Sequence, residues 1–93
     1  MLEVNRRKAI DIIADNSNRL HDEIWLKKHD TINHDLATDG TLSGGEKVLA
    51  NCAISIWNGN ASVRLDDIIA LGDAAFQSVI DALKTARNGE KRR

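Results

Sequence analysis

The stretch Thr41-Leu42-Ser43-Gly44-Gly45-Glu46-Lys47 marks the start of the clearest helix in the chain. Its Ser-x-x-Glu spacing is that of a capping box, in which the Ser43 hydroxyl accepts from the backbone N–H of Glu46 and the Glu46 carboxylate accepts from the N–H of Ser43. Asn58-Gly59 accepts left-handed backbone angles and predicts the end of this helix. Between these signals, apolar residues gather on one helical face, at Val48, Leu49, Cys52, Ala53 and Ile56.

Residues 1–28 carry a second helical pattern. Residues at 3-4-3-4 spacing fall on one face of a helix, and these are Ile10, Ile13, Ser17, Leu20 and Ile24. The weak point is Asn16-Ser17-Asn18, because these side chains bond the local backbone and compete with the helix. Two helices with a kink here remain an alternative. One helix of about 25 residues is favoured, because the apolar stripe keeps its phase across the site.

The remaining segments predict short elements. Residues 29–42 read as a connection, with a short helix at 32–37 and a turn at Asp39-Gly40. Residues 61–65 alternate as in a brief extended segment, and Asp66-Asp67 can cap a short helix over 66–71.

A turn at Gly72-Asp73 precedes the last predicted helix, 74–87, with one apolar face formed by Phe76, Val79, Ile80 and Leu83. Asn88-Gly89 ends it, and 89–93 is expected to be a loose basic tail. The predicted fold class is therefore all-α. It is one domain, 1–93, with a long helix (1–28), a connection (29–42) and a helical core (43–88).

The composition limits the functions that the chain can have. The lone Cys52 leaves no partner for an intramolecular disulfide and fits a reducing compartment, so a cytoplasmic location is expected. No apolar run approaches the roughly 20 residues of a membrane span, so no membrane partner is expected. Charge is uneven: residues 1–10 carry +2 and 84–93 carry +4, whereas 11–83 hold five basic and twelve acidic side chains.

The sequence predicts neither a metal site nor a cofactor nor an enzyme. Three His-Asp pairs occur, at His21, His29 and His34, but their spacings of 8 and 5 residues do not make zinc ligands converge on a helix. Cys52 lies on an apolar helical face, which favours a core role over a thiolate nucleophile. No serine has an acid–base set that the sequence can place.

The string Leu42-Ser43-Gly44-Gly45 resembles the signature motif of ABC-type ATPases. ATP hydrolysis also needs a loop of the form Gly-x-x-x-x-Gly-Lys-Ser/Thr to hold the phosphates, and the chain has none. We therefore interpret the string as a coincidence. Binding of an anion or nucleotide at Gly44-Gly45 is a third hypothesis, after the two described below.

The C-terminal half resembles a winged helix-turn-helix domain. The resemblance rests on Ser62-Val63-Arg64-Leu65, then Asp66-Asp67-Ile68-Ile69-Ala70, then Leu71-Gly72-Asp73 and Val79-Ile80-Asp81-Ala82-Leu83. It implies that the last helix would read DNA. Nucleic-acid contacts would then come from Arg6, Arg7, Lys8, Gln77, Ser78 and Lys84. The helix departs from the family in its Asp81 and its few basic residues, and no wing hairpin follows it.

The first helix is apolar on more than one side, which indicates a further partner. A small domain covers one side of a helix well, so first-helix residues off the main stripe, together with Trp57 near the end of the helix that starts at Ser43, are the candidate protein-binding residues: Ile12, Trp25, Leu26 and Trp57. The alternative is that the two tryptophans simply complete the core. The partner is another protein or a second copy of the chain. The favoured function is a non-enzymatic binding module, similar in type to accessory or regulatory proteins of phages and mobile elements. The alternative is a DNA-binding transcriptional regulator of helix-turn-helix type.

Overall fold

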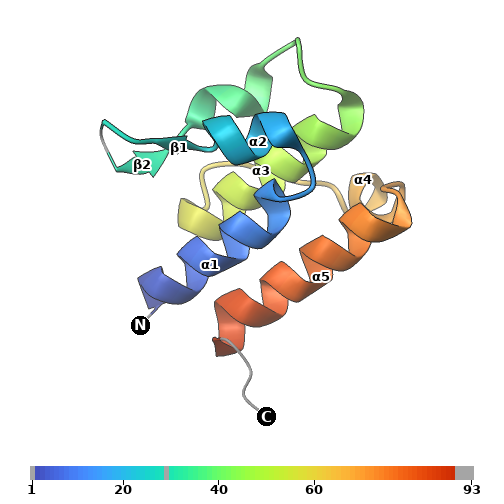
Figure 1. Ribbon diagram of the computed structural model, residues 1–93. Helices are drawn as coiled ribbons and strands as arrows, with labels where there is room; N and C mark the ends of the chain where they lie inside the picture. Colours follow the sequence, from blue (N-terminus) through green and yellow to red (C-terminus); the bar gives the residue numbers. More distant parts are fainter. Residues whose placement is uncertain (1, 29, 90–93) are drawn as a thin grey trace.

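The computed structural model describes residues 2–28 and 30–89 and shows a small helical protein (Figure 1). The elements in chain order are α1 (Leu2–Ala14), α2 (Asn18–Glu23), β1 (Trp25–Leu26), β2 (Thr31–Ile32), the 3-10 helix η1 (His34–Thr38), α3 (Gly44–Asn58), α4 (Leu65–Ile69) and α5 (Asp73–Asn88). The strands form a short antiparallel hairpin, in which Trp25 pairs with Ile32. The predicted all-α class is confirmed. The predicted loose tail lies outside the described residues, except for Gly89.

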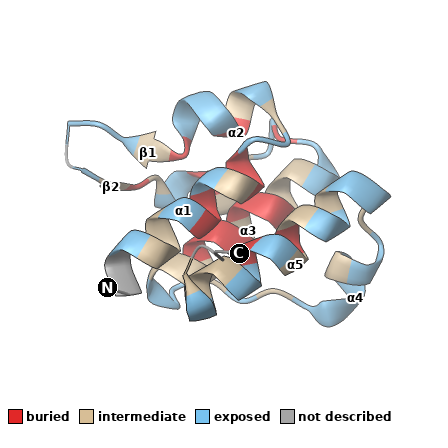
Figure 2. Cartoon of the chain, turned by 60° about the horizontal axis from the view of Figure 1, so that its bottom comes forward, coloured by how far each residue is buried: buried red, intermediate tan, exposed pale blue. Residues whose placement is uncertain are grey.

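The core lies where α1, α3 and α5 meet. Helix α1 packs against both α3 and α5, and its contact with α5 is the most extensive in the fold. Figure 2 shows the buried residues concentrated on the facing sides of α1 and α3. The core also includes side chains from the segment between α1 and α3. Its largest members with almost no exposed surface are Ile10, Ile13, Leu20, Ile24, Ile32, Leu36, Ile54 and Val79.

The prediction of one long N-terminal helix is wrong. Helix α1 ends at Ala14 and α2 begins at Asn18. The Asn16 side chain donates to the carbonyl of Ile13 at 3.0 Å, and the Ser17 hydroxyl caps α2 by accepting from the Leu20 N–H at 3.2 Å. Both polar side chains thus satisfy backbone groups at the break. The four apolar residues of the stripe are nevertheless buried, because α2 folds back over the same core.

The hairpin is the second departure from the predicted helix. The expected helix reached residue 28, but Trp25 and Leu26 form β1 instead. The tip of the hairpin contains Asp30 at φ +50°, a left-handed conformation that aspartate tolerates. The expected short helix at 32–37 is displaced to η1, where the side chain of Asn33 accepts from the Asp35 N–H.

Helix α3 begins as predicted. The Ser43 hydroxyl accepts from the Glu46 N–H at 3.1 Å, and the Glu46 carboxylate accepts from the Ser43 N–H at 3.0 Å. Gly59 ends the helix at φ +75°. The predicted apolar face is confirmed in part. Its members Val48 and Ile56 are only half-buried, whereas Ala50 and Ile54 are buried, because α1, η1 and α5 cover α3 from several sides.

Helix α4 is a single short turn at the edge of the molecule, coloured mostly as exposed in Figure 2. The extended segment expected over 61–65 is not a strand, although Arg64 has extended backbone angles. The predicted cap by Asp66-Asp67 is wrong, because both residues lie inside the first turn and no side chain caps it. There the two carboxylates face the positive end of the helix dipole.

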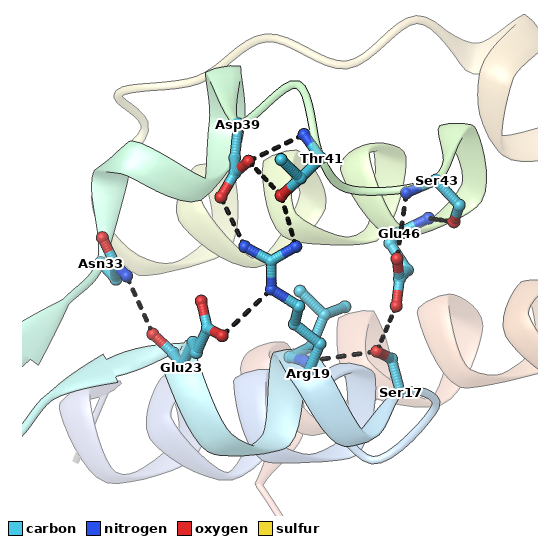
Figure 3. A network of polar contacts seen from close by, with 9 residues as sticks. Ser17, Arg19, Glu23, Asn33, Asp39, Thr41, Ser43 and Glu46 are labelled. Carbon is cyan, nitrogen blue, oxygen red and sulfur yellow. Dashed lines mark hydrogen bonds and ion pairs between the residues drawn. The ribbon is translucent and has the colours of Figure 1, made fainter.

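A polar network joins α2, η1 and the start of α3 (Figure 3). The Arg19 guanidinium donates to Glu23 at 3.0 Å, to Asp39 at 2.7 Å and to the Thr41 hydroxyl at 2.6 Å. Beside it, the Ser17 hydroxyl donates to the Glu46 carboxylate at 2.5 Å. The cap of α2 is therefore bonded directly to the cap of α3.

Candidate functional site

Exposed large apolar side chains gather on the last two helices. Leu65 and Ile69 on α4 are 76% and 72% exposed, and Phe76 and Leu83 on α5 are 37% and 49% exposed. We call these four residues the α4–α5 apolar surface. Elsewhere in residues 4–28 and 30–89, only Val4 and Leu26 are large, apolar and exposed. Apolar groups that cluster on one part of a small protein indicate a binding surface, whereas scattered ones do not.

Helix α5 has two apolar faces, and this corrects the single face expected from the sequence. Val79 and Ala82 are buried, but Phe76 and Leu83 are not, and Ile80 is only half-buried. Small residues let α5 lie close to α1, since alanine occupies positions 75, 82 and 86 on its inner side. Because this close contact uses the inner face, the larger side chains are left on the outer shoulder of the helix.

The seam between α3 and α5 is hollowed along its length. A cavity of about 380 Å³ lies at one end, lined by residues that include Gly45, Val48, Leu71 and Ala75. A smaller cavity of about 100 Å³ follows, lined by residues that include Cys52, Ile68, Val79 and Leu83. A third hollow, near the C-terminal end of α5, is lined by Arg6, Leu83 and Arg87, among others. Leu83 therefore borders both the seam and the apolar surface.

The predicted binding residues Trp25 and Trp57 lie against each other. Their rings make an edge-to-face contact with centroids 5.2 Å apart. The Arg7 guanidinium lies 4.4 Å from the centroid of Trp25 and 5.3 Å from that of Trp57, and it pairs with Asp30 at 3.3 Å. The indole of Trp25 donates to Asp11 at 2.9 Å. This cluster attaches the hairpin to α1 and α3.

The other two predicted binding residues differ in how far they are buried. Ile12 is half-buried and packs against the core, whereas Leu26 on β1 is 38% exposed. Of these four residues, the structure therefore brings the two tryptophans into contact with each other within the chain. That the four residues bind a partner stays a prediction.

The predicted nucleic-acid residues come from α1 and α5. On α1, Arg6 donates to the Trp57 carbonyl at 3.3 Å, Arg7 covers the tryptophans, and the exposed Lys8 also has an interaction. On α5, Gln77 donates to Asp81 at 3.0 Å and Ser78 donates to the Ala74 carbonyl at 3.0 Å, while Lys84 is exposed. Residues 65–83 contain no lysine or arginine and four aspartates, so this part of the two helices offers no basic side chain to phosphates.

The single thiol lies beneath the seam. Burial raises the pKa of Cys52 to about 11, since the thiolate would lose its hydration there. At neutral pH the group is therefore a protonated thiol with little nucleophilic character. Within residues 2–28 and 30–89, no group of three or more His, Cys, Asp or Glu side chains is placed to hold a metal ion.

Comparisons with known proteins add no relative. No protein-family model matches the chain, and neither a curated protein nor a solved structure is significantly similar to it. Among the helices in the described part of the chain, none has the length and apolar character needed to cross a membrane.

Reasoning from the sequence missed the α4–α5 apolar surface, although two signals for it were present. The segment 65–71 is apolar at Leu65, Ile68, Ile69 and Leu71, which is more than one side of a single helical turn can bury. In the last helix, alanines lie on one face and large apolar residues lie on another. Assigning all large residues to the core overlooked the possibility that alanines form the close contact.

Proposed function

We propose that this chain is a non-enzymatic protein-binding module that contacts its partner through the α4–α5 apolar surface. One observation carries the proposal: four large apolar side chains are exposed on two consecutive helices, beside a hollowed seam. Removing such side chains from water is the main favourable term in protein association. The proposal includes an accessory or regulatory role in the cytoplasm, of the kind found in phages and mobile elements.

The surface also has the electrostatic character of an interface. The two helices that carry its apolar side chains also carry Asp66, Asp67, Asp73 and Asp81, all of which are exposed. Polar and charged edges around an apolar centre are typical of protein interfaces. Charged edges set the orientation and the specificity of a partner more than the affinity.

The test compares capture of partners by the wild-type chain and by surface variants. A Phe76→Ser/Leu83→Ser variant removes two apolar groups from the surface, and Val4→Ser removes an exposed apolar group elsewhere. Captured proteins are identified by mass spectrometry, purified and titrated against each chain. We expect the first variant to lose binding and the second to retain it, with both chains folded by circular dichroism. Equal binding by all three chains would contradict the proposal.

DNA binding through the last two helices is a second candidate function. It is supported by the arrangement of two consecutive helices, α4 and α5, separated by residues 70–72, with Gln77 and Lys84 exposed on the second. Phosphate contacts would make binding strongly dependent on salt. A mobility shift of duplex DNA at about 50 mM salt, weakened by Lys84→Gln, is the expected result. Absence of a shift at that salt concentration would end this candidate.

A further inference from the structure

The outer face of α5 carries a stripe whose ends differ in charge. Asp73, Phe76, Ile80, Leu83 and Arg87 follow one another at spacings of 3, 4, 3 and 4 residues. Such spacing keeps the five side chains on one side of a helix, and it is the pattern by which two helices pair. We call these five residues the α5 outer stripe. Its centre is apolar, with an acid at the N-terminal end and a base at the C-terminal end.

The charges at the two ends lie symmetrically about Ile80. Asp73 precedes it by seven residues and Arg87 follows it by seven, which corresponds to about 10 Å of helix on either side. Among residues 2–28 and 30–89, neither the Asp73 carboxylate nor the Arg87 guanidinium has a side-chain hydrogen-bond or ion-pair partner. The fold thus leaves both charges available to another molecule.

This symmetry makes the stripe complementary to itself when two copies run antiparallel. With the two Ile80 residues opposed, Asp73 of each copy faces Arg87 of the other, so two opposite-charge pairs flank the apolar centre. Phe76 then faces Lys84, whose stem can cover the ring while its ammonium lies near the ring face. A parallel pairing would instead oppose Asp73 to Asp73 and Arg87 to Arg87, which repel.

We infer that a second copy of this chain occupies the α5 outer stripe, with the two α5 helices antiparallel and centred on Ile80. The inference rests on the proposed function, because it names the partner of the same surface. The contact is isologous, since the same residues serve both copies. Helix α5 has 16 residues and a length of about 24 Å. An interface of this length is small, so the dimer is weak and forms as concentration rises.

The test is the mass of the full chain as a function of concentration, measured by sedimentation equilibrium at low salt. The wild-type chain is expected to pass from monomer to dimer. The single variants Asp73→Lys and Arg87→Glu each create two repulsive pairs, and we expect about a tenfold weaker dimer for each. The double variant Asp73→Lys/Arg87→Glu restores both attractive pairs in the antiparallel arrangement only, so its affinity is expected to return close to that of the wild-type chain.

The double variant also separates pairing from folding. Asp73 lies in the first turn of α5 and Arg87 in the last, where each charge suits the helix dipole. Reversing both charges is therefore the least favourable change for the stability of the helix itself. Thermal melts of all the chains measure this loss of stability. A double variant that pairs better than either single variant, while melting no higher, supports the inference.

Three results would overturn the inference. The first is a monomeric wild-type chain at the highest soluble concentration. The second is a double variant no better than the single ones. The third is a dimer that Leu65→Ser disrupts and Phe76→Ser leaves intact, because this would place the contact on α4. If the wild-type chain is a monomer, but its Phe76→Ser/Leu83→Ser variant no longer binds a different captured protein, the proposed function stands. Only the second copy as the partner would then be excluded.

Discussion

The N-terminal region, 2–58, and the C-terminal region, 61–89, use their polar side chains in opposite ways. In the first, side chains join elements that are far apart in sequence, as in Arg19 with Asp39, Ser17 with Glu46, and Trp25 with Asp11. In the second, every side-chain hydrogen bond among the described residues joins partners at most four positions apart, from Arg64 with Asp66 to Gln77 with Asp81.

The apolar side chains show the same contrast. Over residues 4–28 and 30–89, most of the large buried apolar residues belong to the first region, whereas four of the six large exposed ones belong to the second. Helix α5 is held to the rest of the fold mainly by its inner face, where Val79 and Ala82 are buried, whereas Phe76 and Leu83 on its other apolar face remain exposed. The comparison teaches that most of the buried core belongs to the first region, to which α5 is joined through α1, while the surface available to a partner lies in the second.

Substituting one isoleucine in each region gives the largest expected difference. Ile54 on α3 is 1% exposed, so Ile54→Ala leaves a cavity and is expected to lower the free energy of unfolding by about 2–5 kcal/mol. Ile69 on α4 is 72% exposed, so Ile69→Ala is expected to change it by less than about 0.5 kcal/mol. Urea denaturation measures both. Similar losses for the two variants would show that α4 is part of the stabilising core.

Acid should weaken the polar network of the N-terminal region. The Ser17 hydroxyl holds the pKa of Glu46 below its ordinary value of 4.5, and the Thr41 hydroxyl holds that of Asp39 below 3.8. A carboxyl group with a lower pKa in the folded state stabilises the protein above its unfolded pKa, and this contribution is lost as the pH falls. We therefore expect the urea midpoint to decrease from about pH 5 downward. Both carboxylates are near solvent, so the effect should be smaller than that of Ile54→Ala.

Glu46→Gln is the matched control for this pH dependence. The amide oxygen still accepts from the Ser43 N–H, as the capping box requires, but the side chain does not titrate. Its urea midpoint should therefore depend less on pH than that of the wild-type chain. An unchanged pH dependence would mean that Glu46 is not among the groups responsible.

Local signals in the sequence were sufficient for α3 and for the all-α class. The capping box at Ser43 and the left-handed cap at Gly59 could both be predicted, because each cap depends only on residues within a few positions of itself. The stripe through Leu20 and Ile24 correctly identified buried residues. The stripe did not show that the helix breaks at Asn16–Ser17. Both α1 and α2 turn their stripe residues toward the same core, so the spacing of the apolar residues continues across the break.

The site was less predictable, because it depends on which helices meet. Trp25 and Trp57 were each readable as candidate binding residues, but their edge-to-face contact under Arg7 joins positions 32 residues apart. The exposure of Phe76 follows from α5 packing on α1 through alanines. The sequence of the last helix alone does not indicate which of its two apolar faces will be covered by the rest of the fold.

A small stabilising effect is expected at the junction of the two regions, at Gly45. Its backbone is helical, and a Cβ there would lie 4.0 Å from the side chain of Leu71, an ordinary contact across the seam. Gly45→Ala is therefore expected to stabilise the fold by about 0.4–1 kcal/mol, because alanine loses less backbone entropy on folding. Gly59→Ala is the contrasting control, since φ +75° strains any residue with a Cβ and should make that variant less stable. Thermal melts compare both with the wild-type chain. A destabilised Gly45→Ala would mean that the seam is closed more tightly around Leu71 than this geometry shows, and the two regions would then be less independent than their hydrogen bonds indicate.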